Sequence, residues 1–403
     1  MLSPDYLDKL GVGAMEIAGE LYGELIKAVV KRLLVRLKSE DEIIFSSADR
    51  YAIKTIQDAG ILLGDITKVI AKYTRRQEDE IRKAYQRAGI EAIHKDDEMY
   101  RLADISPTAL AQSPHLIRLL QRNYEVTMGQ WDNYTRTTAG VLQQTFINEC
   151  NRAYLQVSTG AIGYNRSIMD AIGRLISQDI NTVVYRRPDG TISKTDNIEV
   201  ATLRAVRTGV NQACAYITSQ VAHDHGIYQF LTSAHYGARP SHAVWQGKVF
   251  WVDWDELERR TGLNFGGTIT VPDEIKGKYD EFCVSTEIGT VTGLCGANCR
   301  HSYSPYIEGL DYSPFPPIDE KQNAKDYKIS QKQRAMERAI RKSKRKVEML
   351  EEAIKNAPNE AVADDLDKAQ NRAIGTLQKQ NARYRAFCEA YDLKPQEFRL
   401  FVG

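Results

Sequence analysis

One stretch, residues 231–309, differs from the sequence on both sides of it, and this contrast limits the possible folds most. It holds three of the six cysteines and three of the seven histidines of the 403-residue chain. On either side, apolar residues recur every three or four positions, which is the period of a helix that buries one face. The sequence therefore predicts a mainly α protein with one small α+β module between helical segments.

Residues 1–225 are expected to form a long helical N-terminal arm. Its first helix, over residues 12–37, is amphipathic and too often interrupted by charges to cross a bilayer, which needs about 20 apolar residues. Further helices are predicted from periodicity and from serine, proline and glycine at their ends, over residues 47–60, 65–93, 114–157, 165–178 and 198–223. A β-hairpin is expected near residues 181–195, where β-branched runs flank Asp189-Gly190, a dipeptide suited to a type I′ turn.

The module is expected over residues 226–320, with strands near residues 227–233, 249–254 and 269–272. Residues 321–403 are predicted to form a C-terminal basic helical hairpin. Its helices, about 329–354 and 362–391, carry apolar positions spaced for coiled-coil-like packing.

Charge and cysteine content exclude some classes of function. The chain has 54 Lys and Arg against 53 Asp and Glu, so its net charge of +1 gives no overall attraction to nucleic acid or to an anionic membrane. The six cysteines are sparse and unevenly spaced, which favours a reducing compartment over a secreted disulfide scaffold.

The strongest candidate site is the segment that holds Cys295, Cys299 and His301. Two thiols and an imidazole can converge on one ion if the loop folds back, and this donor set suits a structural zinc ion. His242, Cys283 and His235 are candidates for a fourth ligand, and we favour His242. The alternative is that the cysteines are buried apolar residues and that His301 is a hydrogen-bonded core histidine.

Catalysis by such a metal would require an open coordination position and a nearby general base. The surrounding acids, Glu281, Glu287 and Glu308, stand at no spacing that selects one of them. No P-loop, dinucleotide fingerprint, HExxH or GxSxG motif occurs. No catalytic residue is predicted, and the chain is not expected to be an enzyme.

Arg239 and His242 stand three residues apart, with Gly247 following. They suit either a catalytic pair or phosphate clamp, or a structural role in which they hydrogen-bond the Cys/His loop. We favour the structural role, because no nucleophile stands at a definite spacing from them.

A basic run from residue 328 to 346 contains nine Lys and Arg and one Glu. It could contact DNA phosphates, and the candidate residues are Arg341, Lys342, Lys344, Arg345 and Lys346. An acidic stretch follows it directly. The favoured alternative is therefore that the charges pair across the helical hairpin or face solvent.

Arg239-x-x-His242 with Gly247, followed by Cys295-x-x-x-Cys299-Arg-His301 before Pro305, resembles the head-morphogenesis domain of tailed bacteriophages that the F protein of phage Mu shares. The wider layout is similar to the phage minor capsid protein 2 family. His301 stands where many Mu-type relatives have a cysteine, and both residue types can bind zinc.

The resemblance implies a non-enzymatic minor capsid protein in the virion, in the capsid interior or near the portal, with multiple copies per virion. It would reside in the host cytoplasm during assembly and would act in head assembly or DNA ejection. Its expected partners are the portal protein and/or the major capsid protein, with packaged double-stranded DNA as a further candidate and no membrane. The alternative is a metal-dependent nuclease or hydrolase that uses the Cys/His cluster.

Overall fold

The computed structural model describes residues 2–106, 113–177, 182–266, 281–310, 315 and 317–402. The chain divides into two compact units, each built from three separate segments. Unit 1 comprises Met1–Val12, Glu78–Gln130 and Leu203–Gln331, and unit 2 comprises Gly13–Gln77, Trp131–Thr202 and Lys332–Gly403. The division into 1–225, 226–320 and 321–403 stays a prediction.

Unit 2 is formed by long helices. It contains α2 (Val12–Arg36), α3 (Glu40–Phe45), α6 (Tyr164–Ser177) and α12 (Glu360–Ala390), together with parts of α4 (Ala48–Leu102), α5 (Pro114–Ser158), α7 (Ile198–Asp224) and α11 (Glu320–Lys355). The predicted apolar stripe of α2 is buried, including Leu21, Leu25, Val29 and Leu33. Burial of such a stripe is the main free-energy gain of an amphipathic helix, so the first predicted helix is confirmed.

Two predicted helices, 47–60 and 65–93, are in fact the single helix α4. The sequence predicts a break after Gly60, but a glycine inside a helix costs only about 1 kcal/mol relative to alanine, and α4 continues through both Gly60 and Gly64. Leu62 and Ile66 beside them are buried, and each buried side chain of this size contributes about 1.5–3 kcal/mol. Burial outweighs the cost of the glycines, so the helix continues.

The predicted hairpin is confirmed as β1 (Val183–Arg186) paired antiparallel with β2 (Ile192–Asp196). The predicted type I′ turn is wrong. The Gly190 N–H donates to the Arg187 carbonyl at 2.9 Å, so Pro188 and Asp189 are the central residues. A type I′ turn needs positive φ at both central positions, which the proline ring forbids; of the turn residues only Gly190 has positive φ, at +83°.

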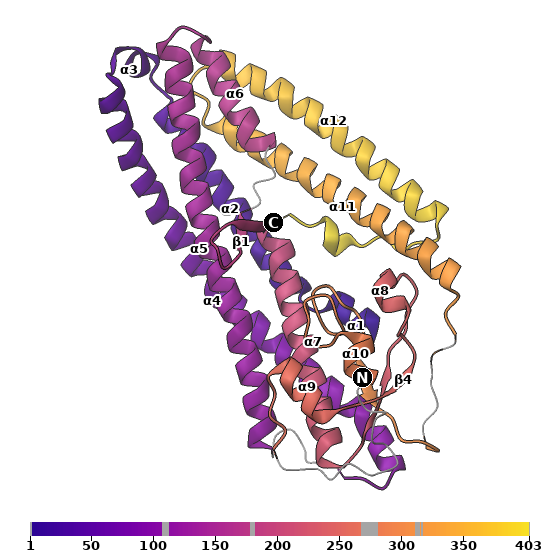
Figure 1. Cartoon of the computed structure of the whole chain (residues 1–403). Coiled ribbons are helices and arrows are strands. Elements are labelled where there is room, and N and C mark those ends of the chain that lie inside the picture. The colour runs from indigo at the N-terminus through magenta and orange to yellow at the C-terminus, as the bar shows by residue number, and fades with distance from the viewer. Residues whose placement is uncertain are drawn as a thin grey trace. The chain divides into compact units, whose positions relative to one another are not determined.

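The C-terminal helical pair is also confirmed, with α11 and α12 lying side by side (Figure 1). Ile340 of α11 packs with Tyr384 and Cys388 of α12 and with Leu400 of the short 3-10 helix η3 (Glu397–Leu400). The Asn359 side chain accepts the Val362 N–H at 3.0 Å and begins α12. Asn359 also donates to Asn165 of α6 at 3.0 Å.

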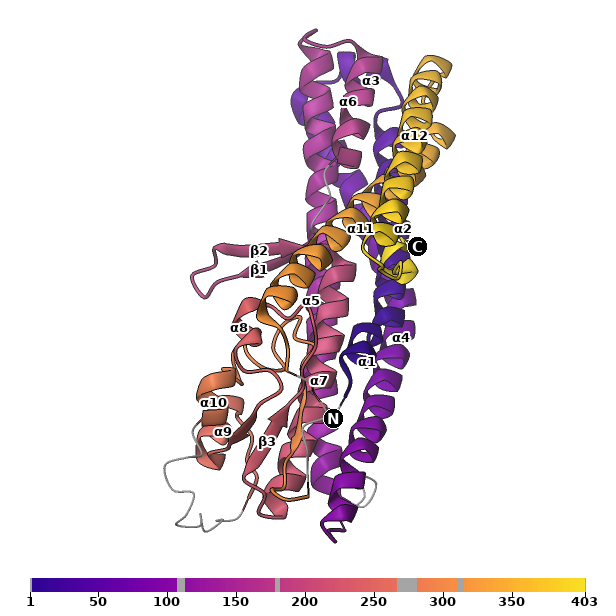
Figure 2. The same ribbon diagram turned by 90° about the vertical axis from the view of Figure 1, so that its right-hand side faces the viewer.

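Unit 1 contains α1 (Pro4–Lys9) and a three-stranded antiparallel sheet in the order β4-β3-β5. The strands are β3 (Gln229–Thr232), β4 (Val249–Trp251) and β5 (Tyr303–Pro305), joined by the short helices α8 (Pro240–Ala243), α9 (Trp254–Thr261) and α10 (Glu281–Thr286). Figure 2 shows α9 and α10 near β3. Phe230, Trp254, Phe282 and Tyr303 form the aromatic centre of the core between them.

The expected fold class, mainly α with a small α+β module, is therefore confirmed. Two of the three predicted strands match β3 and β4, while the one expected at residues 269–272 lies outside the described residues. Within the parts of the chain that the structure describes, no helix combines the length and apolar character that a membrane crossing requires.

Candidate metal centre

The sheet brings together two segments that are far apart in the sequence. Thr232 at the end of β3 pairs with Tyr303 of β5, and one step further the Ser233 N–H donates to the Ser302 carbonyl at 2.9 Å. This pairing fixes the chain around residue 301 beside the segment that leaves β3. That segment turns into α8, where the His242 N–H donates to the Arg239 carbonyl at 2.8 Å.

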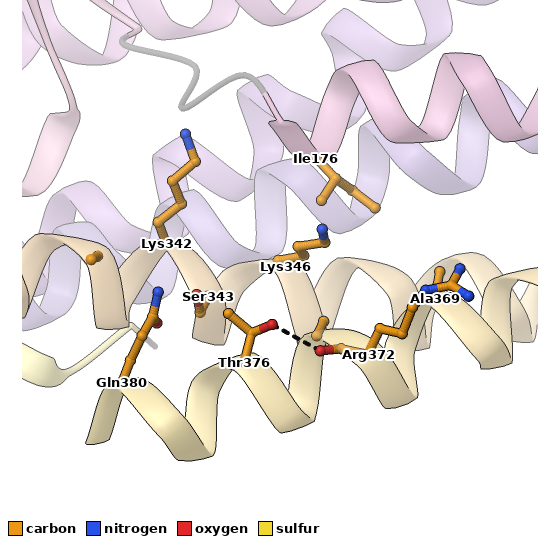
Figure 3. A pocket seen from close by; sticks show the side chains of 10 residues that line it. Ile176, Lys342, Ser343, Lys346, Ala369, Arg372, Thr376 and Gln380 are labelled. Carbon is orange, nitrogen blue, oxygen red and sulfur yellow. Dashed lines mark hydrogen bonds between the residues drawn. The ribbon is translucent and has the colours of Figure 1, made fainter. Parts of the chain in front are cut away.

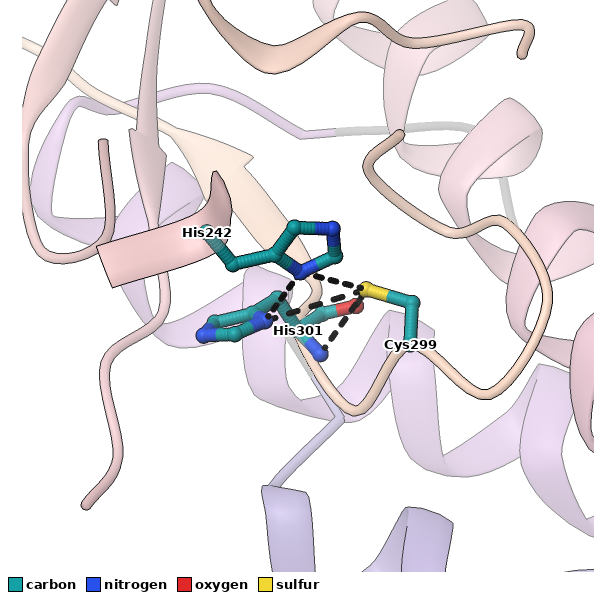
Figure 4. Close-up of side chains that lie close together, drawn as sticks. All are labelled: His242, Cys299 and His301. Atoms are coloured by element: carbon teal, nitrogen blue, oxygen red, sulfur yellow. Dashed lines mark hydrogen bonds between the residues drawn. The ribbon is translucent and has the colours of Figure 1, made fainter. Parts of the chain in front are cut away.

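His242, Cys299 and His301 meet at this point. The two Nδ1 atoms lie 3.2 Å apart, and the Cys299 Sγ lies 3.7 Å from each of them. All three side chains are buried, with 1–2% of their surface exposed. Figure 4 shows both imidazole rings turned toward the sulfur, with dashed lines joining the three atoms.

These separations fit a tetrahedral zinc ion. With Zn–N bonds of about 2.0–2.1 Å and a Zn–S bond of about 2.3 Å, tetrahedral ligand atoms are separated by about 3.3–3.6 Å. Zinc prefers thiolate and imidazole ligands, whereas Mg²⁺ prefers oxygen ligands. One thiolate and two imidazoles therefore suit zinc. By distance and by chemistry, the three residues can hold zinc.

Hydrogen bonds fix which nitrogen of each ring carries a proton. The His242 Nε2 lies 2.8 Å from the Thr292 carbonyl, which can only accept, so Nε2 is the donor. The backbone N–H of His235 donates to the Gln246 Oε1 at 3.1 Å, which identifies this atom as the amide oxygen. The His301 Nε2 lies 3.2 Å from the same oxygen, which can only accept, so the His301 Nε2 is also a donor. Both Nδ1 atoms are then left with a lone pair facing the third ligand. Bound zinc sites commonly have such outer hydrogen bonds.

Burial also keeps the rings neutral, which is the form that binds metal. Desolvation, aided by the Arg239 charge and opposed by the bond to Thr292, lowers the pKa of His242 to about 4. Desolvation and neighbouring positive groups hold the pKa of His301 well below its usual value. Burial raises the pKa of the Cys299 thiol, so zinc binding would displace a proton from it.

The other predicted ligands are placed differently. Cys295 is buried, but its sulfur lies 3.8 Å from the His301 carbonyl and is not one of the three clustered donor atoms. Cys283 lies on α10 in the aromatic core. His235 stacks on the His301 ring at 4.3 Å between centroids, with its Nδ1 3.0 Å from the Tyr236 carbonyl. Of the alternatives for the additional ligand, His242 is the one that joins the cluster.

Arg239 and His242 make the hydrogen bonds that the favoured structural alternative predicted. The Arg239 guanidinium donates to the Ala297 carbonyl at 2.9 Å, so both residues tie the end of β3 to the Cys/His loop. Gly247 has φ +69°, and a Cβ there would lie 3.2 Å from the Ala234 Cβ. Only glycine adopts this conformation without strain.

The sequence gives no role to Asn211, Trp245 and Gln246, although Trp245 and Gln246 belong to the segment that follows His242. Trp245 packs against His242 and His301 at 4.6 and 4.8 Å between ring centroids. Asn211 of α7 donates to the His301 carbonyl at 2.9 Å across 90 positions of sequence. Trp245 and Gln246 stand close to His242 in a conspicuous Trp-Gln-Gly segment, whereas no pattern in the sequence points to Asn211.

The five DNA-contact candidates separate into two groups. Arg345 forms a buried ion pair with Glu199, while Arg341 and Lys344 donate to the carbonyls of Arg399 and Leu400. Lys342 and Lys346 are exposed. Contact with DNA stays a prediction for both groups.

Comparisons with known proteins identify the family of the chain. The family model "Phage minor capsid protein 2" matches residues 2–378, so the chain belongs to that family. It is 23% identical over 348 residues to a "Structural protein" of Lactococcus phage LL-H, a match that covers 82% of this chain and 84% of the relative. It is 31% identical over 93 residues to a "Structural protein" of Lactococcus phage mv4, covering 23% of this chain and 75% of the relative. No solved structure matches the chain.

Proposed function

We propose that the protein is a minor structural component of a phage head that contacts portal or capsid subunits during assembly or DNA ejection, and that its Cys/His centre holds a structural zinc ion. The family match over residues 2–378 carries the assignment to the virion. A position in the capsid interior or near the portal is the finer part of the proposal.

The zinc proposal is supported by three clustered donors with matched separations and outer hydrogen bonds. A bound ion would join α8, which follows β3, to the loop that precedes β5. Structural zinc binding contributes about 10–16 kcal/mol in small zinc-dependent peptides at neutral pH. Such a cross-link would hold together a sheet of only three short strands.

The burial of the donors disfavours the alternative, a metal-dependent nuclease or hydrolase. A catalytic zinc keeps a coordination position that water or substrate can reach. Here all three donor side chains are 1–2% exposed, and the aromatic Trp245 covers both imidazoles. This enclosure favours a structural ion, whose fourth coordination position would be filled by a group other than these three donors.

Elemental analysis of the purified protein tests the metal. We expect about one zinc per chain, and loss of it in Cys299→Ser. The matched control is Cys150→Ser, which should keep the metal. Cys150 is also a buried free cysteine, but it belongs to unit 2, whereas Cys299 belongs to unit 1. A native protein without bound metal would overturn the zinc proposal. A His301→Ala variant that folds normally but loses a metal-dependent turnover would establish the enzyme instead.

The virion assignment is tested by quantitative mass spectrometry of gradient-purified virions and by co-purification with the portal and major capsid proteins. Peptides of this chain should be present at low copy relative to the major capsid protein. Their absence from infectious particles would rule out the proposal whatever the outcome for zinc.

A further inference from the structure

Two adjacent hollows lie along α11 and α12. The first has a volume of about 610 Å³ and lies between α11, α12 and Ile176 at the end of α6. The second, about 430 Å³, continues along α12 and shares Thr376 and Gln380 with the first. Figure 3 shows Lys342 and Lys346 on α11, and Arg372, Thr376 and Gln380 on α12. Together the hollows form one groove, called here the tail groove.

Every charged side chain that lines the tail groove is basic, among the residues that the structure describes. Lys342, Lys346 and Arg372 line the first hollow, and Lys379 and Arg383 line the second. Ser343, Thr376 and Gln380 supply polar groups between them. Five positive charges so close together repel one another unless an anion neutralises them.

The acids of the tail do not neutralise these five cations. Within the described ranges, Glu351 pairs with Lys355 and Asp365 with Lys368, each pair inside its own helix. In the same ranges none of the five lining cations takes part in an ion pair. The inward-facing cations of α11 behave differently, since Arg341, Lys344 and Arg345 bind backbone carbonyls or Glu199. One face of the basic run therefore stabilises the fold of the tail. Another face presents Lys342 and Lys346, which form no ion pair with the described residues.

The lining also limits the chemistry of the ligand. Its apolar residues are small alanines and one isoleucine, and no aromatic side chain lines the groove in the described part of the chain. A protein partner would need deep apolar anchors for most of its binding energy, and single-stranded nucleic acid would gain most from aromatic stacking. The energy available here is mainly electrostatic, which favours a partner with dense and regular negative charge.

We propose that the tail groove binds the phosphate backbone of double-stranded DNA without sequence selectivity. Arg372, Lys379 and Arg383 fall on one side of α12, and eleven helical residues span about 16 Å. One strand of a duplex carries a phosphate every ~3.4 Å along its axis, so this span faces about five phosphates. The assignment keeps Lys342 and Lys346 of the sequence candidates and adds three residues of α12 that the sequence did not single out.

Fluorescence anisotropy of a labelled 30-bp duplex with the full-length protein, titrated over salt concentration, tests this assignment. The logarithm of the binding constant should fall with the logarithm of the salt concentration, with a slope of about −0.9 for each phosphate neutralised. The triple variant Arg372→Gln, Lys379→Gln, Arg383→Gln should reduce that slope by about 2–3. Glutamine keeps a similar helix propensity, so helical circular dichroism should not change.

The matched control is Lys332→Gln, Arg338→Gln, Arg385→Gln. It removes three exposed cations from the same two helices outside the groove and should leave the slope unchanged. Equal losses in the two triple variants would overturn the assignment in favour of a general charge effect. Absence of duplex binding by the native chain would also overturn it, as would displacement of the duplex by poly-glutamate at equal charge concentration, which would point to an acidic protein segment.

Discussion

The loop that carries Cys299 is shaped by glycines that lie against backbone carbonyls. A Cβ on Gly293 would overlap the Glu287 carbonyl, and one on Gly296 would lie 2.6 Å from the Val291 oxygen. Gly293→Ala should therefore lower the free energy of unfolding by about 3 kcal/mol, in the upper range for single substitutions, and should reduce the zinc content. Urea unfolding and elemental analysis measure the two effects.

Gly375→Ala is the control for that substitution. Gly375 lies inside α12, and apart from its chain neighbours and the nearby backbone of its own helix no atom lies within 4 Å of the position that a Cβ would take. Alanine there should stabilise the protein by about 0.5–1 kcal/mol, because glycine loses more conformational freedom on folding. Equal stability of the two variants would contradict the role given to the loop.

Glu337 makes the stability of the tail depend on pH. Its buried carboxyl accepts the Tyr384 hydroxyl at 3.0 Å, and desolvation raises its pKa even though Arg399 lies nearby. The folded state thus holds the proton more tightly than the unfolded chain, in which the pKa is about 4.3. The stability from this proton is present below that pH and is lost as the pH rises through the folded pKa.

Glu337→Gln keeps an oxygen for Tyr384 but cannot ionise. Its thermal midpoint should therefore rise relative to the native chain as the pH increases from 4 to 8, as measured by circular dichroism. Glu389→Gln, which changes an exposed acid on α12, should show no such trend. If instead the thermal midpoint of Glu337→Gln falls relative to that of the native chain as the pH rises, the ion pair between ionised Glu337 and Arg399 dominates the stability.

Residue types were enough to predict His242, Cys299 and His301 as candidate ligands, because thiols and imidazoles are few in this chain and three of each fall in one stretch; the structure brings these three donors together. Their distances depend on the β3–β5 register, which the sequence does not encode locally. For the same reason the sequence does not separate Cys299 from Cys295, whose sulfur lies 3.8 Å from the His301 carbonyl and outside the cluster of three donor atoms. Asn211 reaches the site only through the packing of α7.

At the scale of elements, periodicity predicted those helices that bury a continuous stripe, such as α2, and the pair α11 and α12. It predicted a break at the glycines of α4 because a local preference was weighed without the burial that opposes it. It missed β5, since three residues are too few to show alternation and their pairing partner lies about 70 positions earlier.

The loop of the proposed zinc site also holds the N-terminal segment of unit 1. Arg300, between the two loop ligands, pairs with Asp8 at 2.8 Å, and the Ser302 hydroxyl donates to the Leu2 carbonyl at 2.6 Å. Removing zinc with a chelator should loosen both contacts. Amide hydrogen exchange of residues 4–10 should then accelerate about tenfold or more, because a hydrogen bond to a charged group contributes about 1.5–3 kcal/mol.

The amides of η3 serve as the internal control, since η3 packs on Tyr384 and Cys388 in unit 2. Their exchange should not change on chelation. Equal acceleration in both segments would mean that the metal stabilises the whole chain rather than this contact, and no acceleration in either would mean that the segment is held independently of the loop.

At the scale of the whole molecule, the proposed roles fall on different parts of the chain. The buried zinc site would stabilise unit 1, and the tail groove in unit 2 presents charge without large apolar anchors. Neither feature explains the large apolar side chains that are exposed on α3 and at the start of α4, which are Ile44, Phe45, Ile53 and Ile56. These four side chains fall within residues 44–56, and a contiguous apolar patch is typical of a surface that another subunit covers.

Contact with a head subunit through α3 and α4 predicts that Phe45→Ser, Ile56→Ser enters virions poorly. Phe45 is 81% and Ile56 64% exposed, so neither change should affect folding. A loss of about 1.4 kcal/mol or more at an interface lowers affinity at least tenfold. The measurement is the ratio of this chain to the major capsid protein in purified virions, with only the variant supplied during infection.

Val291→Ser, which changes a residue of unit 1 that is 76% exposed, is the control and should be incorporated normally. Normal incorporation of the double variant, or an equal defect in the control, would overturn the proposed contact through α3 and α4.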